Sequence, residues 1–404
     1  MKLSSRIYFV AKSLKYINIP ADFDALYLHK ANSMNNTGYV IPCYAKFATS
    51  QNNFVPILYH FWDKIPGNSL LALQSLQLRK YFELINTVFF VTYSINQILF
   101  IMAPQEGKPV YRNINGHEIE VKYPCKIYWP DSGITKLELV DYYLAIAPLM
   151  FPYLKQRPVT LHYFPRGIQD ISFYKRDYSH PVPGLIDTYP YEEISQDKVI
   201  DVPVIANEAG IVYLASKGCI EFHNWSSKIT DIYHPDLAIF DLDISWEEDF
   251  PLVLKAALLL QEYLAEQELH SFVKTSGGKG LHLLVPVEPV YSFKQVRDWV
   301  AVIATVMTEK YPEIFSLPDK GNKTHNQNKV VVDFRQNTIT RNTASVYTVR
   351  AKSGAPVSTP LSWDEIKTGK IRPEDFTIKT LPERIKNKGD LFREMLSLTQ
   401  KLPV

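Results

Sequence analysis

The sequence predicts an α+β protein in which mixed central sheets, flanked by helices, form a large core after a smaller N-terminal domain. Three observations support this fold class. From residue 235 onward, apolar runs of strand length alternate with amphipathic stretches of helical length. The chain has 404 residues, more than one typical domain. Hydrophobic residues make up 46% and charged residues 21%, a balance that allows a sizeable core to be buried.

Residues 1–105 are expected to form a small α+β domain. They are rich in Asn and aromatic residues, and apolar positions between Leu70 and Leu84 recur at helical spacing. The Pro- and Gly-containing stretch 103–109 marks the predicted boundary. The most apolar window, Thr87–Met102, is too short and too polar to span a bilayer, and we expect no membrane contact. The sequence assigns this domain no role beyond that of an accessory.

The second predicted domain, residues 110–404, opens with a β-hairpin. Asn115-Gly116 between two short strand-like runs is typical of a type I′ turn. A helix is predicted over Lys136–Leu154, with Thr135 as its N-cap and Glu138 completing a capping box. The further predicted elements are a strand over Leu237–Phe240, a helix over Phe250–Gln267, two strands around a glycine turn over Ser271–Val285, a helix over Phe293–Tyr311 and a strand over Lys329–Phe334.

Charge and cysteine content disfavour several classes of protein. A net charge of +2 is not the footprint of a wholly basic nucleic-acid-binding domain, so any basic surface must be local. Cys43, Cys125 and Cys219 lie far apart and form no CxxC pair. We therefore expect neither a disulfide framework nor a zinc site built from thiolates, and a reducing cytosol fits this cysteine usage best.

Three carboxylates are candidate metal ligands. Asp241 and Asp243 end an apolar strand two residues apart and therefore share a face, and Asp333 ends a second apolar strand. Neighbouring carboxylates repel one another unless a cation lies between them, and an all-oxygen set suits Mg²⁺ or Mn²⁺. Two such ions can activate a hydroxyl and hold a triphosphate. The alternative is that these are ordinary exposed aspartates, because the Asp-x-Asp pattern is short and common.

A glycine-rich loop between the acidic strands is a candidate phosphate site. Glycines in the stretch Thr275–His282 allow a backbone to approach phosphate closely. Ser276 can donate a hydrogen bond, Lys279 can neutralise charge, and His282 can donate when it is protonated. The alternative is a plain hairpin turn. Together with the carboxylates, the loop indicates phosphoryl transfer from a nucleoside triphosphate.

These residues lie in motifs that match a known family. The segments AIFDLD, SFVKTSGGKGLHLLVPV, VVVDFRQN and YTVRAKSGAPVSTPLSWDEI occur in this order. They resemble the polymerase domain of bacterial DNA ligase D, which belongs to the archaeo-eukaryotic primase superfamily. The resemblance begins near the Asn115-Gly116 hairpin and extends to about Asp375. It implies a primase-like catalytic core and a location in the prokaryotic cytosol, associated with the nucleoid.

The resemblance also implies roles for individual residues. It makes Asp241, Asp243 and Asp333 the catalytic, metal-binding carboxylates, holding two Mn²⁺ or Mg²⁺ ions, with Mn²⁺ favoured. The residues that it places at the incoming ribo- or deoxynucleoside triphosphate are Ser276, Gly277, Gly278, Lys279, His282, His223, Gln336, Arg350 and His162. The residues that it places on DNA are Lys126 and Lys136, in a pocket for a 5′-phosphate, and the aromatic pair Phe173 and Tyr174 with Lys175 beside the template strand. Stacking with adjacent cations suits a single strand.

The chain departs from the family pattern in three respects. Where the family usually has a basic pair, this sequence has His162 and Tyr163. The basic stretch before Asp333 is reduced to Lys320, Lys323 and Lys329. Neither the KxDG motif of a ligase nor the histidine cluster of a phosphoesterase is evident.

The function that the resemblance implies is template-directed addition of nucleotides to DNA ends in non-homologous end joining. The implied partners are DNA with 5′-phosphate ends, gaps or overhangs, a Ku-type end-binding protein and a separate DNA ligase. Two alternatives remain open at the level of sequence. One is a stand-alone primase-polymerase of plasmid or phage replication, which needs no 5′-phosphate pocket. The other is a module that bridges DNA ends and polymerises weakly.

Overall fold

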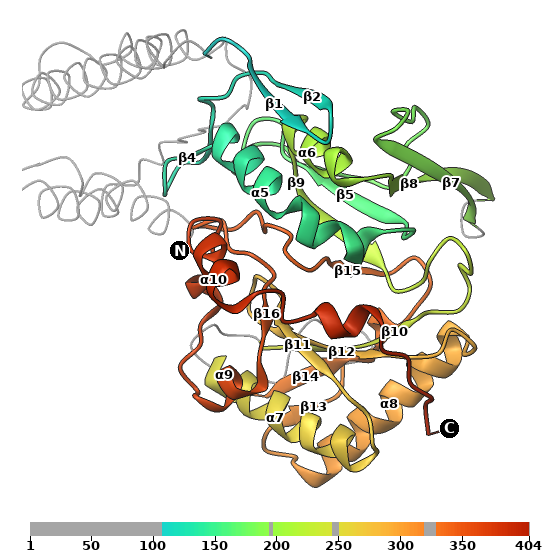
Figure 1. The fold of residues 1–404 in the computed structure, drawn as a ribbon. Coiled ribbons are helices and arrows are strands. Elements are labelled where there is room, and N and C mark those ends of the chain that lie inside the picture. The colour runs from blue at the N-terminus through green and yellow to red at the C-terminus, as the bar shows by residue number, and fades with distance from the viewer. Residues whose placement is uncertain (1–106, 194–196, 245–249, 319–328, 404) are drawn as a thin grey trace, which may run out of the picture. The chain divides into compact units, whose positions relative to one another are not determined.

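The computed structural model describes residues 107–193, 197–244, 250–318 and 329–403, which Figure 1 draws as a coloured ribbon. This part of the chain contains several sheets with helices packed on them, and one of these sheets mixes parallel and antiparallel pairs. The predicted α+β class is therefore confirmed here. The predicted N-terminal domain, residues 1–105, lies outside the described residues, as do Lys320 and Lys323.

The predicted hairpin and its turn are confirmed. Strand β1 (Val110–Ile114) pairs antiparallel with β2 (His117–Val121). Asn115 and Gly116 between them adopt φ angles of 50° and 82°. Two successive positive φ angles define the type I′ turn, whose twist matches that of the two strands.

The predicted capped helix is confirmed as α5 (Lys136–Leu154). Thr135 Oγ1 accepts a hydrogen bond from the backbone N–H of Glu138, and the Glu138 side chain accepts one from the backbone N–H of Thr135. By length and composition, α5 meets the criteria for a membrane-spanning helix. Half of the qualifying window is buried against the rest of the chain, and the core helix of a globular protein meets the same criteria.

A four-stranded antiparallel sheet packs one face against α5 and α6 (Glu208–Ser216), as Figure 1 shows. Its strands, in spatial order, are β15 (Asn342–Ala344), β9 (Cys219–Trp225), β5 (Val159–Tyr163) and β6 (Phe173–Lys175). Two further pairs are β3 (Ile127–Trp129) with β4 (Ile134–Thr135), and β7 (Ile186–Glu193) with β8 (Lys198–Ile205).

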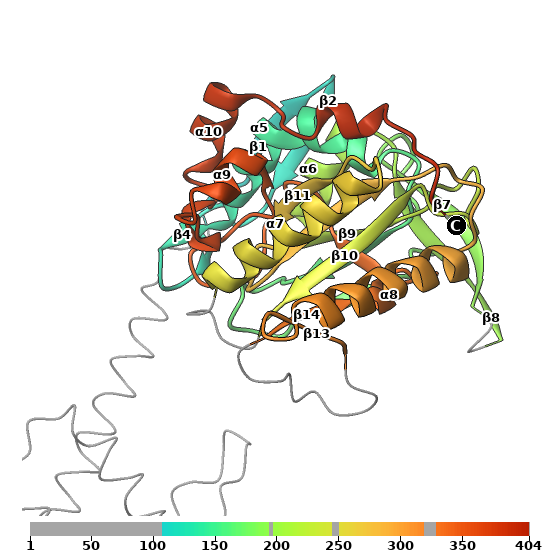
Figure 2. The same cartoon turned by 90° about the horizontal axis from the view of Figure 1, so that it is seen from below.

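A six-stranded sheet carries the candidate carboxylates. Its strands, in spatial order, are β13 (Phe315–Ser316), β14 (Val330–Asp333), β10 (Leu237–Asp243), β12 (Leu281–Pro286), β11 (Phe272–Thr275) and β16 (Pro360–Leu361). Helices α7 (Phe250–Glu266) and α8 (Phe293–Lys310) cover one face, as Figures 1 and 2 show. The elements predicted in this region are confirmed, with ends that shift by a few residues at most.

Side chains alternate between the two faces of the six-stranded sheet. On β10, Phe240 and Leu242 join the core beneath α7 and α8, whereas Leu237 and Ile239 join the core that contains α5. Because the side-chain period of a strand is two residues, Asp241 lies on the face opposite α7 and α8. The sheet therefore directs its acidic positions toward the four-stranded sheet.

The C-terminal segment closes over the edge of both sheets with two short helices, α9 (Trp363–Lys367) and α10 (Leu381–Lys388). Trp363 Nε1 donates a hydrogen bond to the carbonyl of Ser271, and Phe392 packs edge-to-face on Phe272 at a centroid distance of 5.6 Å. Cys125 and Cys219 are free thiols, and Cys43 lies outside the described residues.

Candidate active site

Four side chains form a row across the six-stranded sheet, in the order Asp333, Asp241, His282 and Lys274. Strand register places Asp241 opposite Asp333 on one side and opposite His282 on the other, and it places Lys274 opposite His282. Residues paired across neighbouring strands project from the same face. Asp243 follows two residues after Asp241 on that face. Register therefore brings together the three carboxylates that the sequence proposed as metal ligands.

Asp241 lies in a costly environment for a carboxylate. Burial, together with repulsion from Asp243 and Asp333, raises the pKa of Asp241 well above its usual value. Its Oδ2 accepts a hydrogen bond from Gln336 Nε2 at 3.2 Å. Its Oδ1 is buried, accepts no well-oriented hydrogen bond from the described residues, and lies 3.3 Å from His282 Nε2. An unsatisfied buried oxygen beside two more carboxylates fits a divalent cation that prefers oxygen ligands, such as Mg²⁺ or Mn²⁺.

Asp333 already has a cationic partner. Arg335 Nε and Nη2 lie 2.7 and 2.9 Å from the two carboxylate oxygens of Asp333. The guanidinium is half exposed, with 47% of its side-chain surface accessible. It can therefore swing into solvent when a cation takes its place, at the small cost of breaking an exposed ion pair.

Lys274 was not singled out by the sequence, yet it anchors the row. Its side chain is almost fully buried, and Nζ lies 2.8 Å from His282 Nδ1, 2.9 Å from the carbonyl oxygen of Ala344 and 2.6 Å from Ser358 Oγ. His282 Nε2 in turn lies 3.3 Å from Asp241 Oδ1. Burial lowers the pKa of Lys274 well below its usual value. The contacts with Ala344 and Ser358 hold Lys274 Nζ in place, and its contact with Nδ1 orients the imidazole next to the carboxylates.

The glycine loop between β11 and β12 is folded around one hydroxyl group. Ser276 Oγ accepts hydrogen bonds from the backbone N–H groups of Gly278 and Gly280 at 3.1 and 3.2 Å. These two N–H groups are therefore used inside the loop. Gly277 has a φ angle of +69°, and a Cβ atom there would meet Arg350. A Cβ atom on Gly280 would meet the carbonyl of Leu242, which explains the close approach of this loop to β10.

One cavity of about 580 Å³ joins the row of carboxylates, the glycine loop and the four-stranded sheet. Most of the residues that the sequence proposed for catalysis or nucleotide binding line it. These are Asp241, Asp243, Ser276, Gly278, Lys279, His282, His223, Gln336 and Arg350, together with Tyr174. The lining also contains residues that the sequence did not single out, namely Ile244, Asn342, Thr343, Ala344 and Lys352.

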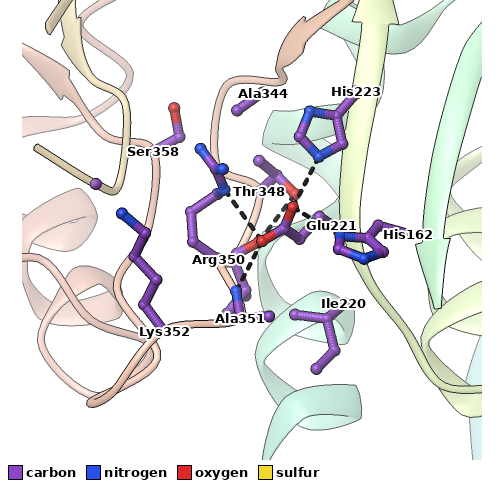
Figure 3. Close-up of polar contacts among 12 residues, drawn as sticks. His162, Ile220, Glu221, His223, Ala344, Thr348, Arg350, Ala351, Lys352 and Ser358 are labelled. Carbon is purple, nitrogen blue, oxygen red and sulfur yellow. Dashed lines mark hydrogen bonds and ion pairs between the residues drawn. The ribbon is translucent and has the colours of Figure 1, made fainter. Parts of the chain in front are cut away.

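Behind the cavity wall formed by His223 and Arg350 lies a buried carboxylate, Glu221 on β9, which the sequence also did not reveal. Its Oε1 accepts hydrogen bonds from Ala351 N at 2.8 Å and Arg350 Nε at 3.2 Å, and its Oε2 contacts His162 and His223, as Figure 3 shows in part. Burial alone would raise the pKa of Glu221, but hydrogen bonds from His162 and His223 and the charge of Arg350 outweigh burial and lower it. Glu221 is therefore ionised at neutral pH.

Arg350 connects the two walls. While its Nε contacts Glu221, its Nη1 donates a hydrogen bond to the carbonyl of Ser276 at 2.7 Å. The guanidinium is thus held in place from both sides at the cavity, where a phosphate could bind it.

The comparison with family models decides which family the chain belongs to. The model of the LigD primase-polymerase domain matches residues 135–392, which is more than half of the chain. The chain belongs to the LigD primase-polymerase family.

Individual relatives agree with this assignment. The chain is 29% identical over 268 residues to a multifunctional non-homologous end joining protein LigD of Pseudomonas aeruginosa, covering 66% of this chain and 31% of that protein. It is 25% identical over 301 residues to a bifunctional non-homologous end joining protein LigD of Bacillus subtilis, covering 74% of this chain and 47% of that protein. The chain therefore spans less than half the length of these two relatives.

A solved structure shares the fold of this primase-polymerase domain. It is the polymerase domain from Mycobacterium tuberculosis ligase D in complex with DNA, matched with a TM-score of 0.61 at 24% identity. The match covers 68% of this chain and 96% of the other chain. The predicted primase-like core is confirmed by this match.

The aromatic residues proposed for DNA lie on β6, the edge strand of the four-stranded sheet of this primase-polymerase domain. Phe173 and Tyr174 are 48% and 59% exposed. Tyr174 stacks on His162 with ring centroids 3.8 Å apart, and Phe173 stacks on Tyr163 at 5.3 Å. Lys175 Nζ lies 4.1 Å from the centre of the Tyr178 ring. The residues that replace the family's basic pair thus support the two exposed aromatic rings from behind.

The two lysines proposed for a 5′-phosphate are neighbours, although neither lines the cavity. The backbone N–H of Lys136 donates to the carbonyl of Lys126 at 2.8 Å, beside the β3–β4 pair. Lys136 is buried, and its Nζ donates a hydrogen bond to the carbonyl of Lys122 at 2.9 Å. Lys126 is partly exposed. The structure therefore brings the pair together, with Lys126 the more accessible of the two.

Proposed function

We propose that this chain catalyses template-directed addition of nucleotides to DNA ends during non-homologous end joining. The observation that carries the proposal is the cavity in which Asp241 and Asp243 face a glycine loop and a fixed guanidinium, with Asp333 paired beside Asp241 on the neighbouring strand. Family membership supports the activity, and the names of the P. aeruginosa and B. subtilis relatives support the pathway. The solved relative is a polymerase domain in complex with DNA, which supports a DNA substrate.

In the proposed reaction, a primer 3′-hydroxyl attacks the α-phosphate of a nucleoside triphosphate in line, and pyrophosphate leaves as the new P–O bond forms. Asp241, Asp243 and Asp333 would hold two divalent cations, Mn²⁺ or Mg²⁺. When bound, such ions lower the pKa of the attacking hydroxyl and offset charge on the leaving group. The Asp241 carboxylate is kept in position by Gln336 and by the imidazole of His282.

The remaining cavity residues bind and orient the triphosphate. Lys279 and Arg350 provide positive charge on two sides of it, and the Ser276 hydroxyl keeps its own proton to donate while its oxygen holds the loop. His223 contributes from the four-stranded sheet. Phe173 and Tyr174 project from opposite faces of β6, so Tyr174 would stack on a base at the cavity and Phe173 on a template base beside the sheet edge, with Lys175 near the backbone.

The wider context is also a proposal. We take residues 110–404 as the catalytic domain and residues 1–105 as an accessory domain. A Ku-type end-binding protein and a separate DNA ligase, the partners that the resemblance implies, would complete the repair reaction in the prokaryotic cytosol. The adjacency of Lys126 and Lys136 favours this reading over a stand-alone primase, which has no use for a downstream 5′-phosphate.

The experiment is single-nucleotide extension on a gapped duplex, with either a 5′-phosphate or a 5′-hydroxyl on the downstream strand and with ribo- or deoxynucleotides. We expect faster extension with the 5′-phosphate, and we expect Lys126→Ala to remove most of that advantage. Lys155→Ala, a lysine on another part of the surface, serves as the control. Equal rates on the two duplexes with the wild-type chain would contradict the end-joining proposal and favour a primase.

A further inference from the structure

Three side chains with metal-ligating atoms converge on the four-stranded sheet, apart from the row of aspartates. His162 on β5 lies opposite Glu221 on β9, and His223 follows two residues later on the same face. His162 Nδ1 lies 3.2 Å from Glu221 Oε2, and His223 Nε2 lies 2.8 Å from the same oxygen. One ligand atom from each residue lies within 4.8 Å of the other two, and Figure 3 shows both rings directed at the carboxylate.

These separations suit ligands of one ion. Nitrogen and oxygen ligands bind Zn²⁺ at about 2.1 Å, so two ligands at right angles are about 3.0 Å apart and two at a tetrahedral angle about 3.4 Å. The two nitrogen-to-oxygen separations, 3.2 and 2.8 Å, lie close to this range, and the two nitrogens lie within 4.8 Å of each other. Two histidines with one carboxylate form a set that transition metals accept and that leaves coordination positions open. Because the ligand atoms already lie this close together, an ion requires only small side-chain adjustments.

In His162 and Glu221, the atoms that face away from the cluster are held by other residues, and the atoms that face into it remain directed at one another. Ser172 Oγ lies 3.2 Å from His162 Nε2, so when Nδ1 binds the metal the ring proton can lie on Nε2, where the hydroxyl accepts it. Tyr174 stacks on the same ring at 3.8 Å. Backbone N–H of Ala351 and the Arg350 guanidinium hold Glu221 Oε1, which leaves Oε2 for the ion.

Burial and charge also suit an ion. The side chains of Glu221, His223 and His162 are only 5%, 9% and 12% exposed. The Arg350 guanidinium already neutralises part of the negative charge of Glu221, and its own positive charge repels a metal ion. We therefore expect an exchangeable ion, not a permanently bound one.

We propose that His162, Glu221 and His223 form a binding site for one divalent transition-metal ion with affinity for imidazole nitrogen, of which Zn²⁺ is the type. The site is distinct from the all-oxygen set of Asp241, Asp243 and Asp333. His223 lines the cavity, so the ion would face it. The role of this ion rests on the proposed function. The ion would supply positive charge to the triphosphate at the place where His162 and Tyr163 replace the basic pair of the family.

The test uses the full-length chain, freed of metals with a chelator and titrated with Co²⁺ alone. Cobalt bound through imidazole with few ligands absorbs visible light more strongly than cobalt bound by oxygen alone. We expect one Co²⁺ with this stronger absorption in the wild-type chain and in Asp241→Asn, and displacement of Co²⁺ by Zn²⁺. His162→Gln and His223→Gln should each weaken this binding at least tenfold. The control is His234→Gln, a half-exposed histidine paired with Asp231 outside the cluster, which should bind Co²⁺ normally.

Several results would overturn the site. These are absence of the stronger absorption in the wild-type chain, its persistence in both His162→Gln and His223→Gln, or its loss in Asp241→Asn. Thermal melting without metal identifies a variant that has failed to fold, and the second histidine variant then decides. The outcome is separable from the proposed function, because Co²⁺ absorption requires neither DNA nor nucleotide. If the chain bound Co²⁺ at this cluster but extended no primers, the metal site would stand and the proposed polymerase activity would be rejected.

Discussion

The Asp241 carboxylate lies between the carboxylates of Asp243 and Asp333, where its buried Oδ1 accepts no well-oriented hydrogen bond from the described residues. Since the folded-state pKa of Asp241 is raised, the protonated carboxyl adds to the stability of the metal-free chain below the unfolded-state pKa. That contribution is lost as the pH rises through the folded-state pKa. A metal ion must displace the proton, so metal affinity should increase with pH.

Asp241→Asn should therefore raise the melting temperature of the metal-free chain at pH 7, by about 1–2 °C for each kcal/mol of repulsion removed. It should also abolish most of the stabilisation that Mn²⁺ gives the wild-type chain. Thermal melting with and without Mn²⁺ at pH 6 and pH 8 measures both effects. A lower melting temperature of the metal-free variant would show that Asp241 stabilises the fold without a metal.

Lys274 illustrates a residue that acts through another. Lys274→Met should leave His282 Nδ1, Ala344 O and Ser358 Oγ without their donor and cost about 1–3 kcal/mol, the penalty for unsatisfied buried polar groups. The turnover rate of extension should fall more than the apparent affinity for nucleotide, because the imidazole beside Asp241 loses its orientation. Urea denaturation and steady-state extension measure the two effects. An unchanged turnover rate in a folded variant would restrict Lys274 to a structural role.

At the scale of elements, the glycine loop depends on backbone geometry that only glycine allows. Gly277 and Gly369 have similar φ angles of +69° and +65°, but only at Gly277 would a Cβ atom meet neighbouring atoms, those of Arg350, Ser358 and Val357. Gly369→Ala should cost about 1–2 kcal/mol, the cost of the left-handed conformation alone. Gly277→Ala should cost more and should weaken nucleotide binding. Urea denaturation of both variants and nucleotide titration test this, and equal costs would contradict it.

Sequence alone predicted the elements whose signals are local. Asn115-Gly116 specifies its turn, and Thr135 with Glu138 specifies the start of α5, because each signal lies within a few neighbouring residues. The register that pairs Asp241 with Asp333 depends on strands far apart in the chain. The sequence therefore predicted only that each of these residues lies at the end of a strand. Lys274 and Glu221 carry no pattern of their own. They become significant through contacts with His282, His162 and His223 that only folding creates.

At the scale of the whole molecule, the C-terminal segment is held by charge. Burial alone would raise the pKa of Glu365, but hydrogen bonds from Arg384 and Lys388 outweigh burial and lower this pKa to about 2. The contact therefore contributes stability above pH 4.5, and this contribution is lost as the pH falls toward 2.

Glu365→Gln should thus destabilise the chain at pH 6, and the difference from the wild type should shrink between pH 4.5 and pH 3. The matched control is Asp364→Asn at the neighbouring position, where the carboxylate side chain is 91% exposed and a change should have little effect at any pH. The urea midpoint at several pH values measures the difference. A difference independent of pH would mean that α9 and α10 are held by packing and not by this charge.

The most direct test of the account is single-nucleotide incorporation on a primed DNA template with Mn²⁺, comparing the wild-type chain, Asp241→Asn and Asp364→Asn, with DNA binding measured in parallel. We predict incorporation by the wild type and by Asp364→Asn, and a loss on the order of 10³-fold in Asp241→Asn without loss of DNA binding. Incorporation by Asp241→Asn at the wild-type rate, or binding of DNA by all three chains with no incorporation by any, would contradict the assignment of nucleotidyl transfer to this cavity.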